Sequence, residues 1–84
     1  MVIIKKMSHF IIACINGNKD IVIESIEQNQ CYDLNNGLRL ASKHGHIDIV
    51  NTLIDYGAND WSGGLEFACK GGHKNIVNLM IQHC

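Results

Sequence analysis

The sequence predicts an all-α solenoid made of three stacked helix-turn-helix repeats. One segment recurs at a fixed spacing, since Ala41 and Ala68, and likewise His46 and His73, stand 27 positions apart. A fainter copy lies upstream, where Ala13 precedes Ala41 by 28 positions. A period of this size is typical of stacked repeats, which bury a continuous core between neighbours and present a recognition surface.

The composition fits one small domain and argues against several classes of function. The chain has 84 residues, of which 46% are hydrophobic and 18% charged, with a formal net charge of -1. This near-neutral balance gives no general attraction to nucleic acid or to an anionic membrane. No apolar run approaches the ~20 residues that span a bilayer. Because Lys5 and Lys6 follow the first apolar residues, we expect no secretory signal and an intracellular, cytoplasmic location.

Each repeat is expected to form two short helices joined by a glycine turn. In the second copy, Ile49, Val50, Leu53 and Ile54 follow the spacing of one helix face. A glycine takes the positive φ of a tight turn without steric cost. The turn glycine recurs in every copy, as Gly17, Gly45 and Gly72.

Capping residues locate the helix ends. One column of the repeat holds residues that favour the N-cap position, and these are Ser8, Asn36 and Gly63. The expected helices span residues 8–16, 19–28, 36–44, 47–56, 63–71 and 74–83.

Helices this short do not hold together alone in water, where about 12–15 residues are needed. Their stability must therefore come from burial against neighbouring repeats. The residues expected in that core include Leu40 and Phe67, Ala41 and Ala68, and Val50 and Val77.

A single domain is expected over residues 1–84, with repeats at about 8–34, 35–61 and 62–84. Residues 1–7 are expected to fold back as an N-terminal cap. The reason is that Ser25 stands where later repeats have an apolar residue, which leaves space for an apolar side chain from the N-terminal segment.

These residues resemble the ankyrin repeat. The second copy matches the family pattern at Leu38, Ala41, Gly45, His46, Ile49, Val50, Leu53, Ile54, Gly57 and Ala58. The third copy matches it at Leu65, Ala68, Gly72, His73, Ile76, Val77 and Ile81. The resemblance implies an ankyrin-type solenoid that acts as a non-enzymatic protein-interaction module without a cofactor.

The chain departs from the family pattern in two places. The Thr-Pro-Leu-His tetrapeptide is replaced by Asn36-Gly37-Leu38-Arg39 in the second copy. The link between repeats is about six residues shorter than in the usual repeat of about 33 residues, so shortened loops replace the β-hairpin fingers. Such repeats are similar to those of giant DNA viruses of amoebae. That similarity implies a host protein as partner and the host cell cytoplasm as location.

The resemblance places the partner-binding surface on the first helix of each repeat and on the loop tips. Carried over position by position, the helix residues are Ile15, Asn16, Lys43, His44 and Lys70. The loop residues are Asp33, Asn35, Asp60, Trp61 and Ser62. The lysines and the histidine form a basic patch, so the partner is expected to present acidic or hydrogen-bond-accepting groups. Trp61 is either an apolar position beneath the next helix or an exposed aromatic anchor.

Two alternative functions stay open. A thiol- or metal-dependent protein would use Cys31, Cys84 and the histidines. Zinc needs three or four ligands that converge on one ion, whereas His46 and His73 are expected to stand one repeat apart, so no metal site is predicted. No phosphate loop or Cys-x-x-Cys motif is present, and no enzyme activity is expected. The second alternative is a self-assembling structural element that associates through its under-capped C-terminal repeat.

Overall fold

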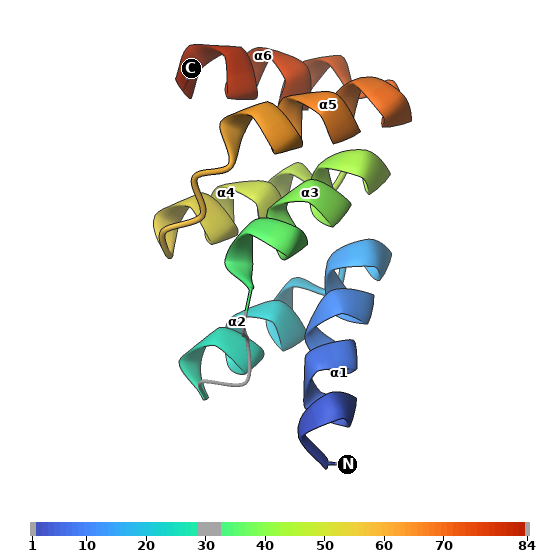
Figure 1. The fold of residues 1–84 in the computed structure, drawn as a ribbon, viewed down its shortest axis with the longest axis vertical. Helices are drawn as coiled ribbons and strands as arrows, with labels where there is room; N and C mark the ends of the chain where they lie inside the picture. Colours follow the sequence, from blue (N-terminus) through green and yellow to red (C-terminus); the bar gives the residue numbers. More distant parts are fainter. Residues whose placement is uncertain (1, 29–32, 84) are drawn as a thin grey trace.

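Six α-helices form the described part of the chain, in three pairs. The computed structural model describes residues 2–28 and 33–83, with side chains from residue 9 onward. The helices are α1 (Val2–Asn16), α2 (Lys19–Glu27), α3 (Leu34–His44), α4 (Ile47–Asp55), α5 (Trp61–Gly71) and α6 (Lys74–His83). Figure 1 shows the pairs stacked along the long axis, with α1 and α2 at one end and α5 and α6 at the other. The described residues contain no strand. The predicted all-α, ankyrin-type solenoid is confirmed.

The first helices of the pairs form the main contact between repeats. α3 packs against both α1 and α5, whereas the second helices α2, α4 and α6 touch one another less. The stack is 36 Å long and about half as wide. Figure 1 shows α3 and α5 lying side by side, whereas α1 is inclined to them and meets α3 near its own C-terminal end.

The N-caps of α3 and α5 differ from the prediction. Asp33 caps α3, and its Oδ1 accepts a hydrogen bond from the backbone N–H of Asn36 at 3.0 Å. Asp60 caps α5, with its Oδ1 3.1 Å from the backbone N of Gly63. The prediction of N-caps at Asn36 and Gly63 was wrong, because a carboxylate three residues earlier satisfies their N–H groups.

Helix α1 begins at Val2, so Ser8 lies inside the helix and the predicted N-cap at Ser8 was wrong. Residues 2–7 contain no glycine or proline that would end a helix. They continue α1 without a turn. Their role as a cap stays a prediction.

The core runs between the helix pairs through the whole stack. Its buried hydrophobic members are Phe10, Ala13, Cys14, Val22, Leu38, Ala41, Ile49, Val50, Leu53, Ala58, Ala68, Ile76 and Met80. The predicted burial of Ala41, Ala68 and Val50 is confirmed, while Val77 is half-buried. The core is therefore shared between neighbouring pairs, as the short helices require.

The predicted burial of Leu40 and Phe67 was wrong. Both side chains are half-buried and lie outside the core cluster. Leu38, which is fully buried, precedes Leu40 by two positions. At 3.6 residues per turn, such a step points to nearly the opposite side of the helix.

A histidine of each later repeat binds the backbone of the preceding repeat. The Nε2 of His46 lies 2.8 Å from the carbonyl oxygen of Ile15, and the Nε2 of His73 lies 3.1 Å from that of Lys43. Because a carbonyl oxygen only accepts, each imidazole donates its Nε2–H. We call this contact the histidine latch. It occurs between the first and second pairs and again between the second and third.

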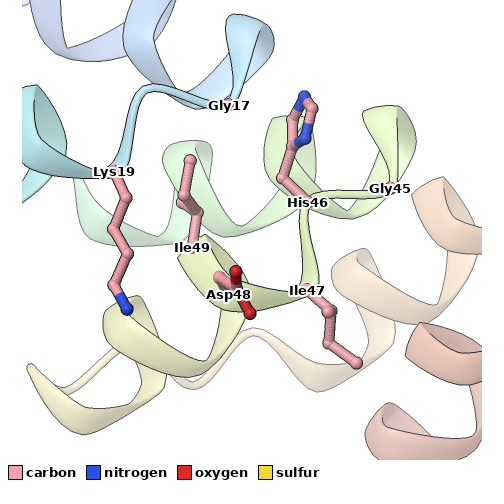
Figure 2. Close-up of a pocket in the computed structure, with 7 residues that line it drawn as sticks. All are labelled: Gly17, Lys19, Gly45, His46, Ile47, Asp48 and Ile49. Carbon is pink, nitrogen blue, oxygen red and sulfur yellow. The ribbon is translucent and has the colours of Figure 1, made fainter.

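The latch also explains the turn glycines. Gly17 and Gly45 have φ values of 82° and 81°, which confirms the predicted left-handed turns. A Cβ on Gly17 would lie 2.8 Å from the His46 ring, and one on Gly45 would lie 2.5 Å from the His73 ring. Figure 2 shows the His46 ring beside the turn at Gly17. The turn therefore needs glycine for its φ angle and for the space that the imidazole occupies.

Side chains of α3 hold the loop that leads into α5. The Oδ1 of Asn35 accepts hydrogen bonds from the backbone N–H groups of Asn59 and Asp60, at 2.8 and 3.0 Å. The guanidinium of Arg39 lies 2.6 Å from the Oδ2 of Asp60. The bond with Arg39 and the bond from the Gly63 N–H lower the pKa of Asp60 below its usual value of 3.8. These bonds fix the direction in which α5 leaves the loop.

The latch predicts a difference between two turn glycines with nearly the same backbone conformation. Gly72→Ala introduces a Cβ at a positive φ of 75°, which should cost about 1 kcal/mol. Gly45→Ala adds a collision with the His73 ring and should cost roughly 1–3 kcal/mol more. Chemical denaturation of the two variants measures this difference. Equal destabilisation would contradict the latch.

The Arg39–Asp60 pair predicts a pH dependence. Because the pKa of Asp60 is lowered in the folded state, its contribution to stability is complete above about pH 4 and is lost as the pH falls through the folded pKa. The variant Asp60→Asn should therefore lose less free energy of unfolding than the wild type between about pH 4 and pH 2. Denaturation at several pH values measures both slopes. The same slope in both proteins would rule out this contribution.

Candidate protein-binding surface

A line of apolar side chains crosses the exposed face of the first helices. Ile12 on α1, Leu40 on α3 and Phe67 on α5 occupy the same column of the repeat. Ile12 is 51% exposed, and the other two are half-buried outside the core. Since α3 packs against both α1 and α5, these equivalent positions follow one another along the first helices. We call this line the apolar stripe.

A column of basic residues lies beside the apolar stripe. Lys43 and Lys70 follow Leu40 and Phe67 by three positions, which places them on the same helix face. Both lysines are exposed, as is His44 in the last turn of α3. A cation is favoured at the C-terminal end of a helix, where the helix dipole is negative. We call Lys43, His44 and Lys70 the basic column.

Lys70 links the basic column to the apolar stripe. Its Nζ lies 5.1 Å from the centre of the Phe67 ring and 3.4 Å from Glu66. The side chains of this ion pair are more than half exposed, so the pair contributes little to stability. Lys70 therefore remains available to a partner that covers Phe67.

The first repeat presents a different surface at the equivalent positions. Ile15 is half-buried and Asn16 is exposed, and neither carries a charge. The surface thus changes from apolar and neutral on α1 to apolar and basic on α3 and α5. This gradient gives the face a direction along the stack.

The loop residues that were predicted to bind a partner have structural roles that the repeat pattern did not predict. Asp33 and Asp60 are N-caps, and Asn35 holds the loop before α5. Ser62 is exposed within the first turn of α5. Most polar atoms of Asp33, Asn35 and Asp60 form hydrogen bonds within the protein. These residues therefore hold α3 and α5 in place and contribute little to the binding surface itself.

Trp61 begins α5, and it is half-buried rather than fully buried or fully exposed. Its ring stacks on that of His83 in α6, with ring centres 4.1 Å apart and planes 10° from parallel. This stack joins the start of α5 to the end of α6.

The second helices of the first two pairs, α2 and α4, carry charge of the opposite sign. Five exposed carboxylates lie on α2 and α4, namely Asp20, Glu24, Glu27, Asp48 and Asp55. Tyr56 donates a hydrogen bond to Glu27 over 3.3 Å, and partial burial together with Glu27 and Asp55 raises the pKa of Tyr56. The small net charge is thus the sum of a basic column on α3 and α5 and an acidic surface on α2 and α4.

The histidines do not form a metal site in the described part of the chain. No group of three His, Cys, Asp or Glu side chains gathers there, and His46 and His73 bind separate carbonyl groups. A hollow of about 200 Å³ lies near His46, lined also by Lys19 and Asp48 (Figure 2). Its charges have opposite signs, and it offers no convergent set of ligands. Cys31 and Cys84 lie outside the described residues.

The apolar stripe is the part of this surface that sequence reasoning missed. The column of Ile12, Leu40 and Phe67 is apolar in all three copies. A core column shows the same pattern in the sequence. Only the packing of neighbouring helices shows whether the column is buried in the core or lies on the surface. Here the buried positions are occupied by Phe10 and Leu38 instead.

Comparison with known families agrees with this architecture. The family model "Ankyrin repeat" matches residues 33–61, which comprise α3, α4 and the loop into α5. The comparison with curated proteins and the comparison with solved structures returned no match. None of the described helices is long and apolar enough to cross a membrane. Residues 33–61 thus match an ankyrin repeat, and the described residues fold as an ankyrin-type solenoid.

Proposed function

We propose that this protein is a non-enzymatic interaction module whose protein partner covers the apolar stripe and the basic column. Ankyrin repeats generally mediate protein–protein interactions, so an interaction role follows from the repeat at residues 33–61. The observation that carries the proposal is the exposure of Ile12, at 51%, in line with Leu40 and Phe67. A solvent-exposed apolar line that crosses three repeats is typical of a binding surface.

The chemistry of the surface defines the partner. Burying an apolar side chain such as Ile12 or Phe67 yields roughly 1.5–3 kcal/mol, so the stripe supplies affinity. Lys43, His44 and Lys70 favour a partner with acidic or hydrogen-bond-accepting groups beside its apolar residues. Charges at the rim of an interface mainly increase the association rate and select the partner.

The remaining site residues either extend the binding surface or hold the helices that carry it. Ile15 and Asn16 extend the surface on α1, while Trp61 and Ser62 extend it at the start of α5. Asp33, Asn35 and Asp60 act indirectly, because their bonds hold α3 and α5 at the spacing that the partner meets.

We also propose that the short repeats, which lack the Thr-Pro-Leu-His tetrapeptide, are of the viral type. On that proposal the partner is a host protein and the location is the host cell cytoplasm. Nucleic acid and membranes are weaker candidates, because the net charge is -1 and no broad basic face is present among the described residues.

Charge reversal of the basic column tests the surface. Lys43→Glu with Lys70→Glu should weaken capture of the partner from host lysate by about ten-fold or more, because two attractive contacts become repulsive. The matched control is Lys19→Glu with Lys74→Glu, which reverses two exposed lysines on the second helices. Quantitative pull-down compares the captured protein. Loss of capture in the control alone would move the site to the second helices.

The apolar stripe predicts that binding and stability separate at two neighbouring leucines. Leu38→Ala removes a fully buried side chain and should cost roughly 2–5 kcal/mol of stability. Leu40→Ala lies outside the core and should cost about 1 kcal/mol or less, yet weaken partner binding. Thermal denaturation and the same pull-down measure both effects. If Leu40→Ala lowers stability as much as Leu38→Ala does, then Leu40 is a core residue and the apolar stripe is wrongly assigned to the surface.

A further inference from the structure

The second helices of this chain carry the chemistry that its own first-helix surface is expected to bind. We call the exposed carboxylates of α2 and α4 the acidic surface, and these are Asp20, Glu24, Glu27, Asp48 and Asp55. The described residues form two ion pairs, Arg39–Asp60 and Lys70–Glu66, and neither includes one of these carboxylates. Their negative charges are therefore available to a cationic surface of another molecule.

The carboxylates and the lysines follow the same repeat. Glu27 and Asp55 are equivalent residues of the first two pairs, as Lys43 and Lys70 are of the last two. Glu27 lies close to the end of α4, since its Oε2 accepts a hydrogen bond from Tyr56. The helices that carry the lysines, α3 and α5, lie side by side (Figure 1). Both surfaces therefore present their charges once per helix pair, so that two carboxylates of one copy can face two lysines of another.

The acidic surface also has an apolar component. Tyr56, which directly follows α4, is 42% exposed. A hollow of about 500 Å³ on α2 is lined by Asp20, Ile23, Glu24, Glu27 and Gln28. A lysine buries its aliphatic stem along apolar surface and leaves its ammonium at the polar rim, so this hollow fits a lysine side chain. The acidic surface thus combines apolar and acidic groups, as the apolar stripe and the basic column require.

We propose that the apolar stripe and the basic column of one copy bind the acidic surface of a second copy of this chain. In this contact Lys43 and Lys70 face carboxylates of α2 and α4, and Tyr56 packs on the apolar stripe beside Phe67. Because this contact uses the surface of the proposed function, it rests on that proposal and adds a regulation to it. A surface covered by a second copy is closed to the protein partner.

Three properties of the chain favour a second copy as the occupant. The two surfaces have charges of opposite sign, and these charges have the same repeat. Copies with a net charge of only -1 also do not repel one another strongly at long range. The contact joins two different surfaces, so the copies at the ends of an assembly each keep a free surface. Such a heterologous contact builds rings or open chains of copies.

Sedimentation equilibrium of the full-length chain tests the contact. At low salt the average mass should rise above the 9.4 kDa of one chain as its concentration increases to about 1 mM. Salt at about 1 M should restore the monomer, because the Debye length is then about 3 Å. A carbodiimide, which joins an amine to a carboxylate in contact, should link Lys43 or Lys70 to the acidic surface. In a mixture of isotopically labelled and unlabelled chains, mass spectrometry identifies the links between copies.

Two charge-reversed variants identify the two surfaces. The first is Lys43→Glu with Lys70→Glu. The second is Glu27→Lys with Asp55→Lys, at the last residues of α2 and α4, where a lysine suits the helix dipole. Each variant alone should associate about ten-fold more weakly or less. A mixture of the two should recover association, because each variant then meets a surface of opposite charge.

The matched control is Lys19→Glu with Lys74→Glu, which changes the net charge by the same amount and should keep most of the association. A chain that stays monomeric at low salt up to about 1 mM, or that associates equally after either reversal, would overturn the proposal. Cross-links confined to other residues would also overturn it. Capture from host lysate is measured separately. A monomeric chain whose capture depends on Lys43 and Lys70 would contradict self-association and still support the proposed function.

Discussion

Each repeat of this protein consists of helices too short to be stable alone, so the packing of the first helices must join the repeats, and the histidine latch fixes the position of each repeat on the one before it. The imidazole of His46 or His73 lies on a glycine turn and donates a hydrogen bond to a carbonyl beside it. The left-handed φ of the glycine turns the chain between the two helices. The absent side chain at the same glycine makes room for the ring. One residue type thus satisfies a backbone constraint and a packing constraint together.

The latch fixes how each repeat aligns with the one before it, and this alignment determines both the core and the binding surface. Because the imidazole reaches a fixed carbonyl of the preceding repeat, equivalent positions of neighbouring first helices follow one another along the stack. Core residues such as Leu38 and Ala68 then meet between the helices. The same alignment brings Ile12, Leu40 and Phe67 into one line on the outside. A slip by one helical turn would destroy the line and open the core, so the surface is as well defined as the fold.

The order of the helices could be predicted from the sequence because the repeat supplies its own alignment. Gly17, Gly45 and Gly72 mark the turns, and each turn has the positive φ that glycine permits. The helix starts were harder to predict, because Asp33 and Asn36 are both favourable caps. Only the distance from a carboxylate to an N–H group decides between them.

The binding surface could be predicted only in part. The basic residues follow from the family pattern, but the columns of Leu38 and Leu40 are both apolar, so periodicity does not show which one faces the core. The contact of Trp61 with His83 depends on how α5 packs on α6, which the repeat pattern does not contain. Aligning the three repeats with one another predicts only the contacts that they share. A contact that occurs in one repeat alone cannot be predicted in this way.

A double-mutant cycle between Gly45 and His73 tests the latch most directly. Gly45→Ala, His73→Ala and the double variant are compared with the wild type by chemical denaturation. If the imidazole occupies the space above the glycine, removing it relieves the collision, and the two substitutions should couple by about 1 kcal/mol or more. Additivity within about 0.3–0.5 kcal/mol would show that the two residues do not meet, and the register of the stack would then need another explanation.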